Sequence, residues 1–284
     1  MTGVQAKMLS GNRLHLQHGP IDLVIGVDGN RAIAFDAARS RFDTILAGLV
    51  TELDDLRQPL HPDSPVPAGA VAKRMHAAAM PFCETFLTRM AAVAGAVADE
   101  VLQAMTSATP LHRAYVNNGG DIALHLAKGE RFTMAMAGLD GGDLGRVEIS
   151  HNDGIGGIAT SGQGGRSLSF GIAESVTILA KNAATADVAA TLIANAVDLP
   201  NHPAIRRAPA HDLRDDTDLG DRLVVTRCDP LSVADIKTAL NNGTRTARAM
   251  QNGQKIDAAA LFLQGQNRTL GPQFTPQHRT ITYA

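Results

Sequence analysis

Three segments between Val116 and Thr191 decide the fold of this chain: VNNGGDIALHL (Val116–Leu126), GIGGIATSGQGGRS (Gly154–Ser167) and ESVTILAKNAATADVAAT (Glu174–Thr191). In them, glycines and small hydroxyl residues alternate with apolar runs rich in β-branched side chains. Apolar runs between tight turns predict strands, and the alanine-rich end of the third segment predicts a helix. We expect the three segments to build a pocket for a phosphate-bearing ligand and a divalent metal.

The sequence outside these segments alternates between strand patterns and amphipathic helices. Strands are expected at Arg13–Gln17, Ile21–Val27, Ala114–Asn117, Ile122–Ala127, Arg131–Ala137, Arg146–His151, Leu168–Ile172, Val176–Ala180, Leu223–Arg227 and Ile256–Leu263. Helices are expected at Ala32–Leu56, Val71–Met80, Glu84–Met105, Ala186–Ala196 and Ser232–Met250. This order predicts an α+β fold with mainly antiparallel sheets and helices packed on one face.

Composition excludes several classes of protein. Hydrophobic residues make up 44% of the 284 residues, enough for a large core, and the formal net charge is −2. Without a basic tract, we expect no binding to nucleic acid. The two cysteines stand far apart, which excludes a paired-cysteine zinc site. The N-terminus has no apolar signal core, and the apolar run at Met90–Ala98 is too short to span a membrane. We therefore expect a soluble, cytoplasmic protein that could form a homo-oligomer.

The first segment carries the candidate ligand residues Asn118, Gly119, Gly120 and Asp121. Paired glycines let main-chain N–H groups approach an anion without obstruction by a Cβ atom, and Asp121 could accept hydrogen bonds from ribose hydroxyls. The alternative is a simple hairpin, because Asn-Gly is a strong hairpin dipeptide.

The second segment contains six glycines in fourteen residues. Its candidate ligand residues are Thr160, Ser161, Gly162, Gly165 and Arg166, of which Arg166 offers a planar guanidinium to phosphate oxygens. The segment fits neither the Walker A pattern nor the GxGxxG turn. It is interpreted as a phosphate loop of another kind, with a flexible solvent loop as the alternative.

Asp187 and Thr191 are the candidate metal ligands. They lie four residues apart at the start of a predicted helix and so project from one face. A carboxylate and a hydroxyl form a pair of hard oxygen ligands suited to Mg²⁺, which completes its shell with water and phosphate. The alternative roles are a favourable charge at the helix N-terminus for Asp187 and a bond to the preceding turn for Thr191.

His151 is the candidate catalytic base, because it ends a predicted strand just before the glycine-rich segment. The alternative is a turn histidine without a chemical role. No Ser-His-Asp arrangement, HExxH motif or pair of catalytic carboxylates can be argued.

Taken in order, NNGGDI, ATSG and ADVAAT, with the SVTILA strand before the last, resemble the ApbE superfamily of flavin transferases. More closely, the chain resembles a smaller, functionally uncharacterised branch of it, over residues 94–197. The resemblance implies a T-fold-like architecture of two related halves. We accordingly expect one ApbE-like domain over residues 1–284, with intertwined halves, a surface excursion at 200–221 and a tail at 275–284.

The resemblance also implies a ligand. In the transferases, the GGD and ATSG segments line an FAD cleft, and the last motif holds Mg²⁺ at the pyrophosphate. The matching positions are Gly119, Gly120 and Asp121, then Thr160, Ser161 and Gly162, and finally Asp187 and Thr191.

The chain departs from the transferases after ATSG. They continue with His-Ile-x-Asp-Pro, whereas this chain continues with QGGRSLSFGIAE, and it also lacks their lipoprotein signal and anchor cysteine. Two functions stay open. One is a Mg²⁺-assisted transferase or phosphoester-cleaving enzyme acting on a flavin nucleotide or other phosphorylated cofactor. The other is a non-catalytic cofactor-binding or carrier protein that has lost the transferase chemistry.

Overall fold

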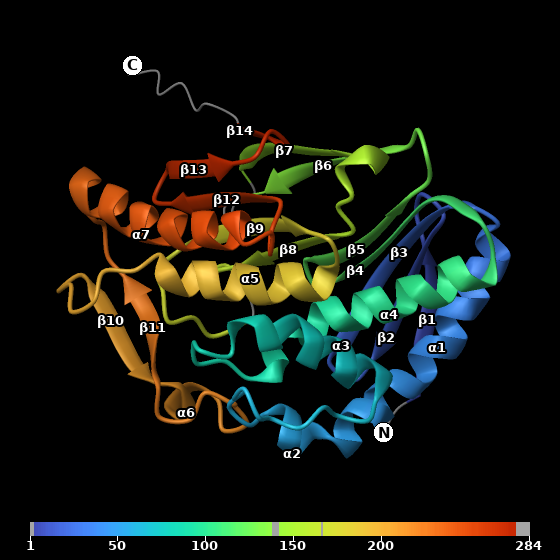
Figure 1. Cartoon of the computed structure of the whole chain (residues 1–284), viewed down its shortest axis with the longest axis horizontal. Coiled ribbons are helices and arrows are strands. Elements are labelled where there is room, and N and C mark those ends of the chain that lie inside the picture. Colours follow the sequence, from blue (N-terminus) through green and yellow to red (C-terminus); the bar gives the residue numbers. More distant parts are fainter. Residues whose placement is uncertain (1–2, 138–141, 166, 277–284) are drawn as a thin grey trace.

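A nine-stranded sheet forms the centre of the computed structural model, which describes residues 3–137, 142–165 and 167–276 (Figure 1). Its strands lie in the order β1 (Gln5–Leu9), β2 (Arg13–His18), β3 (Ile21–Gly29), β4 (Leu111–Asn118), β5 (Asp121–Leu126), β8 (Gly157–Ser161), β9 (Ser175–Ala180), β12 (Ala258–Leu263) and β13 (Gln266–Leu270). Every pair of neighbouring strands is antiparallel, so the predicted antiparallel α+β class is confirmed.

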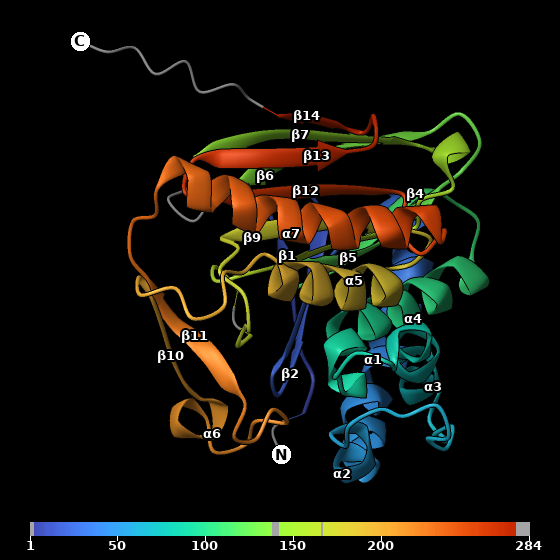
Figure 2. The same cartoon turned by 60° about the vertical axis from the view of Figure 1, so that its left-hand side comes forward.

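Helices cover one face of this sheet, as predicted (Figures 1 and 2). They are α1 (Arg31–Thr51), α2 (Leu53–Leu56), α3 (Ala70–Ala79), α4 (Val93–Ala108), α5 (Ala183–Ala196) and α7 (Val233–Asn252), with the short 3₁₀ turns η1 (Met80–Phe82) and η2 (Arg89–Ala92). The helix α6 (Ala210–Leu213) and the turn η3 (His151–Asp153) lie apart from this face. A three-stranded sheet of β14 (Phe274–Pro276), β7 (Asp143–Ser150) and β6 (Arg131–Ala137) covers the opposite face at β5, β8, β9 and β12 (Figure 2).

The two related halves that the resemblance implies are present in the topology. Strands β2, β3, β4 and β5 are adjacent in that order, and α1 and α4 lie between β3 and β4 in the chain. Strands β8, β9, β12 and β13 repeat this order, with α5 and α7 between β9 and β12. The halves join where β5 pairs with β8, through Ile122↔Ile158 and Ala123↔Gly157. The sheet is therefore continuous across both halves.

Small residues let α4 and β8 approach the start of α5 closely. A methyl group on Gly95 of α4 would overlap the main chain of Ala183 at the start of α5. One on Gly157 of β8 would overlap the main chain of Asn182. Close packing of elements thus explains the small side chains around Gly95, and strand packing explains part of the glycine-rich segment.

Several predicted boundaries are wrong. The helix expected from Glu84 begins at Val93, because the Thr88 side chain accepts from the Met90 N–H (3.1 Å) and starts a separate 3₁₀ turn. The strand expected at Leu168–Ile172 is a loop. A hydrogen bond from the Phe170 N–H to Asn195 Oδ1 (2.9 Å) holds this loop in place. Conversely, part of the predicted glycine loop is strand β8.

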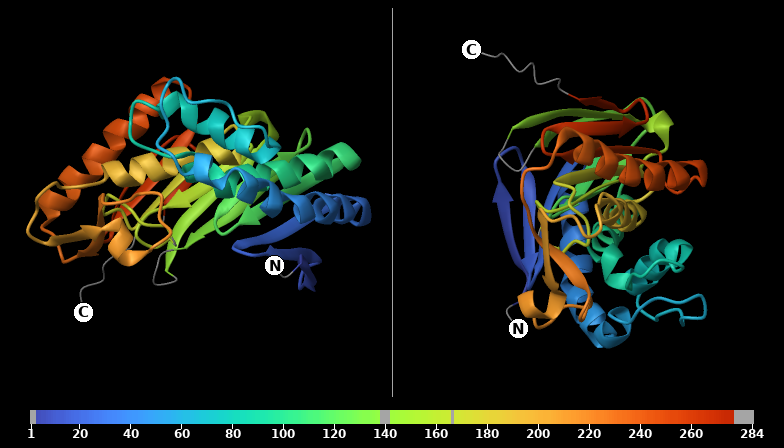
Figure 3. Two further views of the ribbon diagram at one scale, coloured as in Figure 1. Left: turned by 90° about the horizontal axis from the view of Figure 1, so that it is seen from below. Right: turned by 90° about the vertical axis from the view of Figure 1, so that its left-hand side faces the viewer.

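The excursion expected at 200–221 contains regular structure. Strand β10 (Ile205–Pro209) pairs with β11 (Leu223–Cys228), and this hairpin extends away from the main sheet with α6 at its far end (Figures 1 and 3). Of the expected tail, residues 275–276 belong to β14, and 277–284 lie outside the described residues.

Candidate functional site

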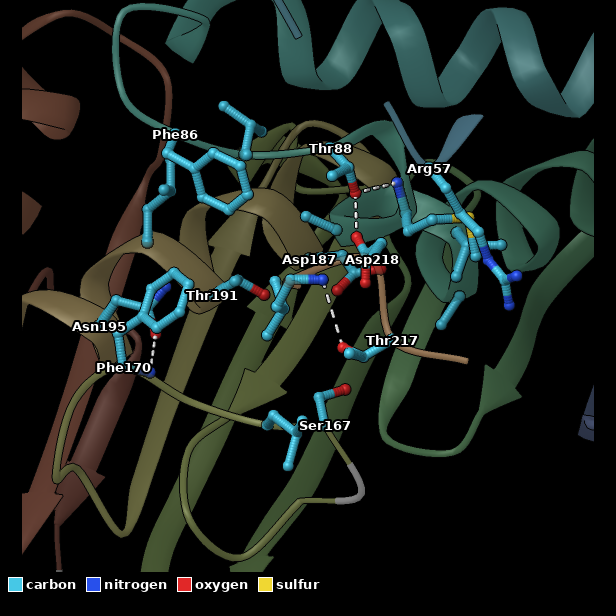
Figure 4. Close-up of a pocket in the computed structure, with 18 of the residues that line it drawn as sticks. Arg57, Phe86, Thr88, Ser167, Phe170, Asp187, Thr191, Asn195, Thr217 and Asp218 are labelled. Carbon is cyan, nitrogen blue, oxygen red and sulfur yellow. Dashed lines mark hydrogen bonds between the residues drawn. The ribbon is translucent and has the colours of Figure 1, made fainter. Parts of the chain in front are cut away.

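A cavity of about 320 Å³ lies between α5, the segment before α4, the loop after Arg166 and the loop 214–219 (Figure 4). It is lined by Arg57, Phe86, Leu87, Thr88, Met90, Ala91, Val93, Ala94, Asp121, Ser167, Leu168, Phe170, Asp187, Thr191, Leu192, Asn195, Arg214, Asp216, Thr217, Asp218 and Leu219. The predicted metal ligands Asp187 and Thr191 both belong to this set, as does the predicted ligand residue Asp121.

Helix α5 positions Asp187 and Thr191 one turn apart, so both side chains reach the same wall of the cavity (Figure 4). The Gly95 N–H donates to Asp187 Oδ2 (3.0 Å), and the Ala94 N–H also bonds to this carboxylate. Burial raises the pKa of Asp187 well above its usual value, and the charge of Asp121 raises it further. A carboxylate has about four lone-pair sites, so two N–H bonds leave capacity for a cation.

The Asn118-Gly119-Gly120-Asp121 segment is the hairpin turn between β4 and β5. Gly119 and Gly120 have φ angles of 66° and 118°, a left-handed conformation that glycine adopts without strain. Asn118 is buried, and its Nδ2 donates to the Ala94 carbonyl (3.0 Å). Gly119 and Gly120 shape the turn, and the turn brings Asp121 to the cavity.

The ATSG residues divide between the two faces of the sheet. Thr160 Oγ1 lies 3.0 Å from Thr177 Oγ1, and Thr177 is paired with Ala260 in the cluster under the small sheet. Because side chains alternate along a strand, Thr160 faces the small sheet and Ser161 faces the helices. The Thr160 side chain therefore points away from the face on which Asp187 lies.

The turn that follows β8 is held by its own main chain. The Gly165 N–H donates to the Gly162 carbonyl (3.0 Å), and the Gln163 N–H donates to the Ala173 carbonyl (2.8 Å). Ser167, directly after this turn, lines the cavity. Arg166 lies outside the described residues.

His151 lies in a different part of the molecule, in the turn after β7 of the small sheet. It is exposed, its Nδ1 lies 2.6 Å from the Leu126 carbonyl oxygen, and it is not among the residues that line the cavity.

Two aromatic residues of the cavity were not identified from the sequence. The rings of Phe86 and Phe170 lie 6.1 Å apart between centroids, and the Arg222 guanidinium lies 3.3 Å over the Phe86 ring. Phe170 lies within the segment that was predicted to be a strand. Phe86 lies in the segment that was predicted to be helix.

The loop 214–219 was also missed, because it belongs to the excursion that was interpreted as mere surface. Thr88 Oγ1 donates to Asp218 (Figure 4). Arg57 Nη2 lies 3.5 Å from Asp216 Oδ2, so both contacts join the loop to the opposite wall of the cavity. The dense run of aspartates and arginines in RDDTDLGDR (residues 214–222) was the available signal.

Helices α4 and α5 cap each other at their N-termini. Asp99 of α4 accepts from the Ala183 and Ala184 N–H groups of α5 (3.0 and 2.9 Å), while Asp187 of α5 accepts from the Gly95 N–H of α4. Both N-terminal turns are thus already hydrogen-bonded by carboxylates. An anion in the cavity would have to be held by side chains or a cation instead.

Acidic groups outnumber basic ones around the cavity. Four aspartates (Asp121, Asp187, Asp216 and Asp218) and two arginines (Arg57 and Arg214) line it. Within residues 3–137, 142–165 and 167–276, no three His, Cys, Asp or Glu side chains form a cluster able to hold a metal by themselves. A cation here would share its coordination with a bound ligand or water.

The chain is similar to a known family, to curated proteins and to solved structures. The family model described as AbpE bacteria matches residues 6–269. A UPF0280 protein of Methanothrix thermoacetophila is 38% identical over 113 residues, 38% of this chain and 45% of the relative. A UPF0280 protein of Methanobrevibacter smithii is 34% identical over 131 residues, 44% of this chain and 51% of the relative. The chain thus spans about half the length of these relatives.

Two solved structures cover nearly the whole chain at low identity. The ApbE protein of Thermotoga maritima is 11% identical, covering 93% of this chain and 96% of that one, with a TM-score of 0.48. The flavinyl transferase ApbE of Pseudomonas stutzeri is 12% identical, covering 97% and 96%, with a TM-score of 0.40. No helix in the described part of the chain is long and apolar enough to cross a membrane.

Proposed function

Because this chain belongs to the AbpE bacteria family, whose model matches residues 6–269, we propose that it binds a flavin nucleotide or another phosphorylated cofactor together with Mg²⁺. The ligand occupies the cavity beside α5. We place the protein in the cytoplasm, with a role in cofactor metabolism.

The charge balance of the cavity is the observation that carries the proposal. The cavity has four aspartates and two arginines, so acidic groups exceed basic groups by two, and the ionised carboxylates repel a free phosphate ester. A divalent cation bound with the phosphate removes that repulsion. Because the charge of Asp121 lies next to buried Asp187, a cation reduces the electrostatic repulsion most at the α5 wall. We therefore expect ligand and metal to bind together.

Asp187 and Thr191 are the proposed protein ligands of Mg²⁺. A carboxylate and a hydroxyl on one helical turn provide two hard oxygens, and the phosphate and water complete the octahedral shell. Asp187 is oriented by the Gly95 N–H, so its carboxylate does not need to reorganise to meet the ion.

The other side of the cavity suits a flat ring and an anion. Phe86 and Phe170 present aromatic surface, and Arg57 and Arg214 present guanidinium groups to phosphate oxygens. Gly119, Gly120, Ser161, Gly162 and Gly165 act through the main chain of the turns around the site, and Arg166, outside the described residues, stays a sequence-based proposal for phosphate binding.

Two outcomes follow for a bound flavin nucleotide. In an enzyme, Mg²⁺ held by Asp187 and Thr191 would supply charge neutralisation for the leaving AMP of FAD, and FMN would pass to a hydroxyl or to water. In a carrier, the cofactor binds and stays intact. The carrier is favoured by one observation: no histidine is among the described residues that line the cavity, so the wall offers carboxylates but no imidazole as a base.

Thermal unfolding of the full chain with FAD, FMN or ADP, each with and without Mg²⁺, tests the proposal. A stabilisation that requires nucleotide and Mg²⁺ together is expected in the wild type, and ligand at a hundred times its Kd adds about 2.7 kcal/mol. Thr191→Val should abolish it, and Thr191→Ser, which keeps the hydroxyl, should retain it. The absence of any Mg²⁺-dependent shift with all three nucleotides would contradict the proposal. Mass spectrometry after incubation with FAD then separates the two classes: AMP and FMN indicate an enzyme, and intact FAD indicates a carrier.

A further inference from the structure

A second hollow, of about 440 Å³, lies between α7 and the edge strand β13, and it shares no lining residue with the cavity beside α5. Helix α7 runs alongside β13 at the outer edge of the nine-stranded sheet (Figures 1 and 2). The hollow is lined by Asn241, Thr244, Arg245, Arg248 and Arg268. Three of its five lining residues are therefore arginines.

Secondary structure brings these arginines together. Asn241, Arg245 and Arg248 are spaced by four and three residues, so they form one stripe along α7. Arg268 lies opposite Leu261 in the β12–β13 pair, and Leu261 is buried under the helices, so both side chains project toward α7. Two elements thus direct positive charge into one hollow.

The three guanidinium groups have no acidic partner among the residues that the structure describes. Within that part of the chain, Arg245 donates only to Asn242 Oδ1 (3.1 Å) and Arg268 only to the Asn267 carbonyl (2.8 Å). Each guanidinium carries five N–H donors, so most of them stay available. The chain from Lys237 to the end of α7, and all of β13, contain no acidic residue. In a chain with net charge −2, this local excess of positive charge is a distinct feature.

We infer that this hollow binds a small, multiply charged phosphate of pyrophosphate size, at a site separate from the metal-dependent cavity. Like charges on neighbouring turns of a helix repel each other, and a bound polyanion reverses that repulsion. The guanidinium forks match phosphate oxygens in pairs, and the Asn241 amide adds a neutral donor. Because guanidinium groups are cations, they attract the phosphate directly, so binding requires no metal and weakens with ionic strength.

Isothermal titration of the full chain with inorganic pyrophosphate, in EDTA and at low salt, tests the site. EDTA removes Mg²⁺, so the acidic cavity beside α5 does not contribute. The wild type should bind, Arg248→Ala and Arg268→Ala should each bind about tenfold more weakly, and the double variant should bind still more weakly. Arg248→Lys should fall between Arg248→Ala and the wild type, since it keeps the charge and loses the fork.

Arg39→Ala is the matched control, because Arg39 is exposed on α1 and far from the hollow in sequence and fold. It removes the same charge and should leave the affinity unchanged. Two results would overturn the inference: a wild type that does not bind pyrophosphate at low salt, or an affinity that falls equally in Arg39→Ala and in the variants of the hollow. Circular dichroism melts of each variant confirm that the compared proteins are folded.

Discussion

Replacing Asp99 by asparagine should change how the stability of this protein depends on pH. Asp99 is half-buried in α4, where its two carboxylate oxygens accept from the Ala183 and Ala184 N–H groups. Burial disfavours the charged form, and the two N–H bonds favour it. Burial wins, and the pKa of Asp99 rises from its ordinary value of 3.8 to about 6.

The size of the effect follows from that pKa. Between pH 3.8 and about 6 the folded protein holds the proton of Asp99 more tightly than the unfolded chain does. The contribution of Asp99 to the unfolding free energy is therefore complete below the pKa that Asp99 has in the unfolded chain. It is lost as the pH rises through the pKa that Asp99 has in the folded protein. The pKa of Asp99 is about two pH units higher in the folded protein than in the unfolded chain. At about 1.4 kcal/mol per pH unit, this difference lowers the unfolding free energy by about 3 kcal/mol once the pH is above both values. The amide side chain of the Asp99→Asn variant does not titrate, so the variant shows no such loss.

Urea denaturation of both proteins at intervals from pH 4 to pH 8 measures this effect. The difference in unfolding free energy, wild type minus Asp99→Asn, should fall by about 2.5 kcal/mol over that range, since a small part of the loss already occurs below pH 4. Asp63→Asn is the control, because Asp63 is exposed in a loop and the same substitution there removes a carboxylate without touching a helix N-terminus. A difference that rises with pH would refute the reasoning, since it would mean that the two N–H bonds outweigh burial.

Three other changes have defined outcomes. Asp187→Ala should abolish Mg²⁺ binding in the presence of ADP, measured by calorimetry, because it removes the only carboxylate proposed as a metal ligand; Mg²⁺ affinity within twofold of the wild type would contradict that role. Gly157→Ala should lower the unfolding free energy, measured in urea, by at least about 2 kcal/mol, because the added methyl group overlaps main-chain atoms. Gly48→Ala on α1 should raise it by about 0.5–1 kcal/mol, because the added methyl group meets no other atom there and alanine favours a helix. Equal effects of the two alanines would disprove the packing argument. Phe86→Ala should weaken FAD binding more than ADP binding, measured by fluorescence quenching and calorimetry, because the ring contacts a flat ligand and not its phosphate; an equal loss for both would count against a flavin ring at that wall.

Several elements could be predicted from residues that are neighbours in the sequence. Apolar periodicity located most helices, and the helix expected from Ser232 is capped by that residue, whose hydroxyl accepts from the Asp235 N–H. The hairpin at Gly119-Gly120 is also a local feature, because two residues with positive φ specify it. By contrast, the glycines at 156 and 157 suggested a loop, although they belong to close packing against the start of α5.

The sequence by itself determined the antiparallel α+β class, the glycine turn before Asp121 and the pairing of Asp187 with Thr191 on one helical turn, because each depends on residues close together in the chain. Only the tertiary structure decided that Asp121 lies near Asp187, that Thr160 faces the other side of the sheet, and that loop 214–219 closes the cavity. These three facts depend on which distant elements pack together. Burial, local charge and the raised pKa of Asp187 arise only from that packing, since an isolated segment leaves each of these side chains in water.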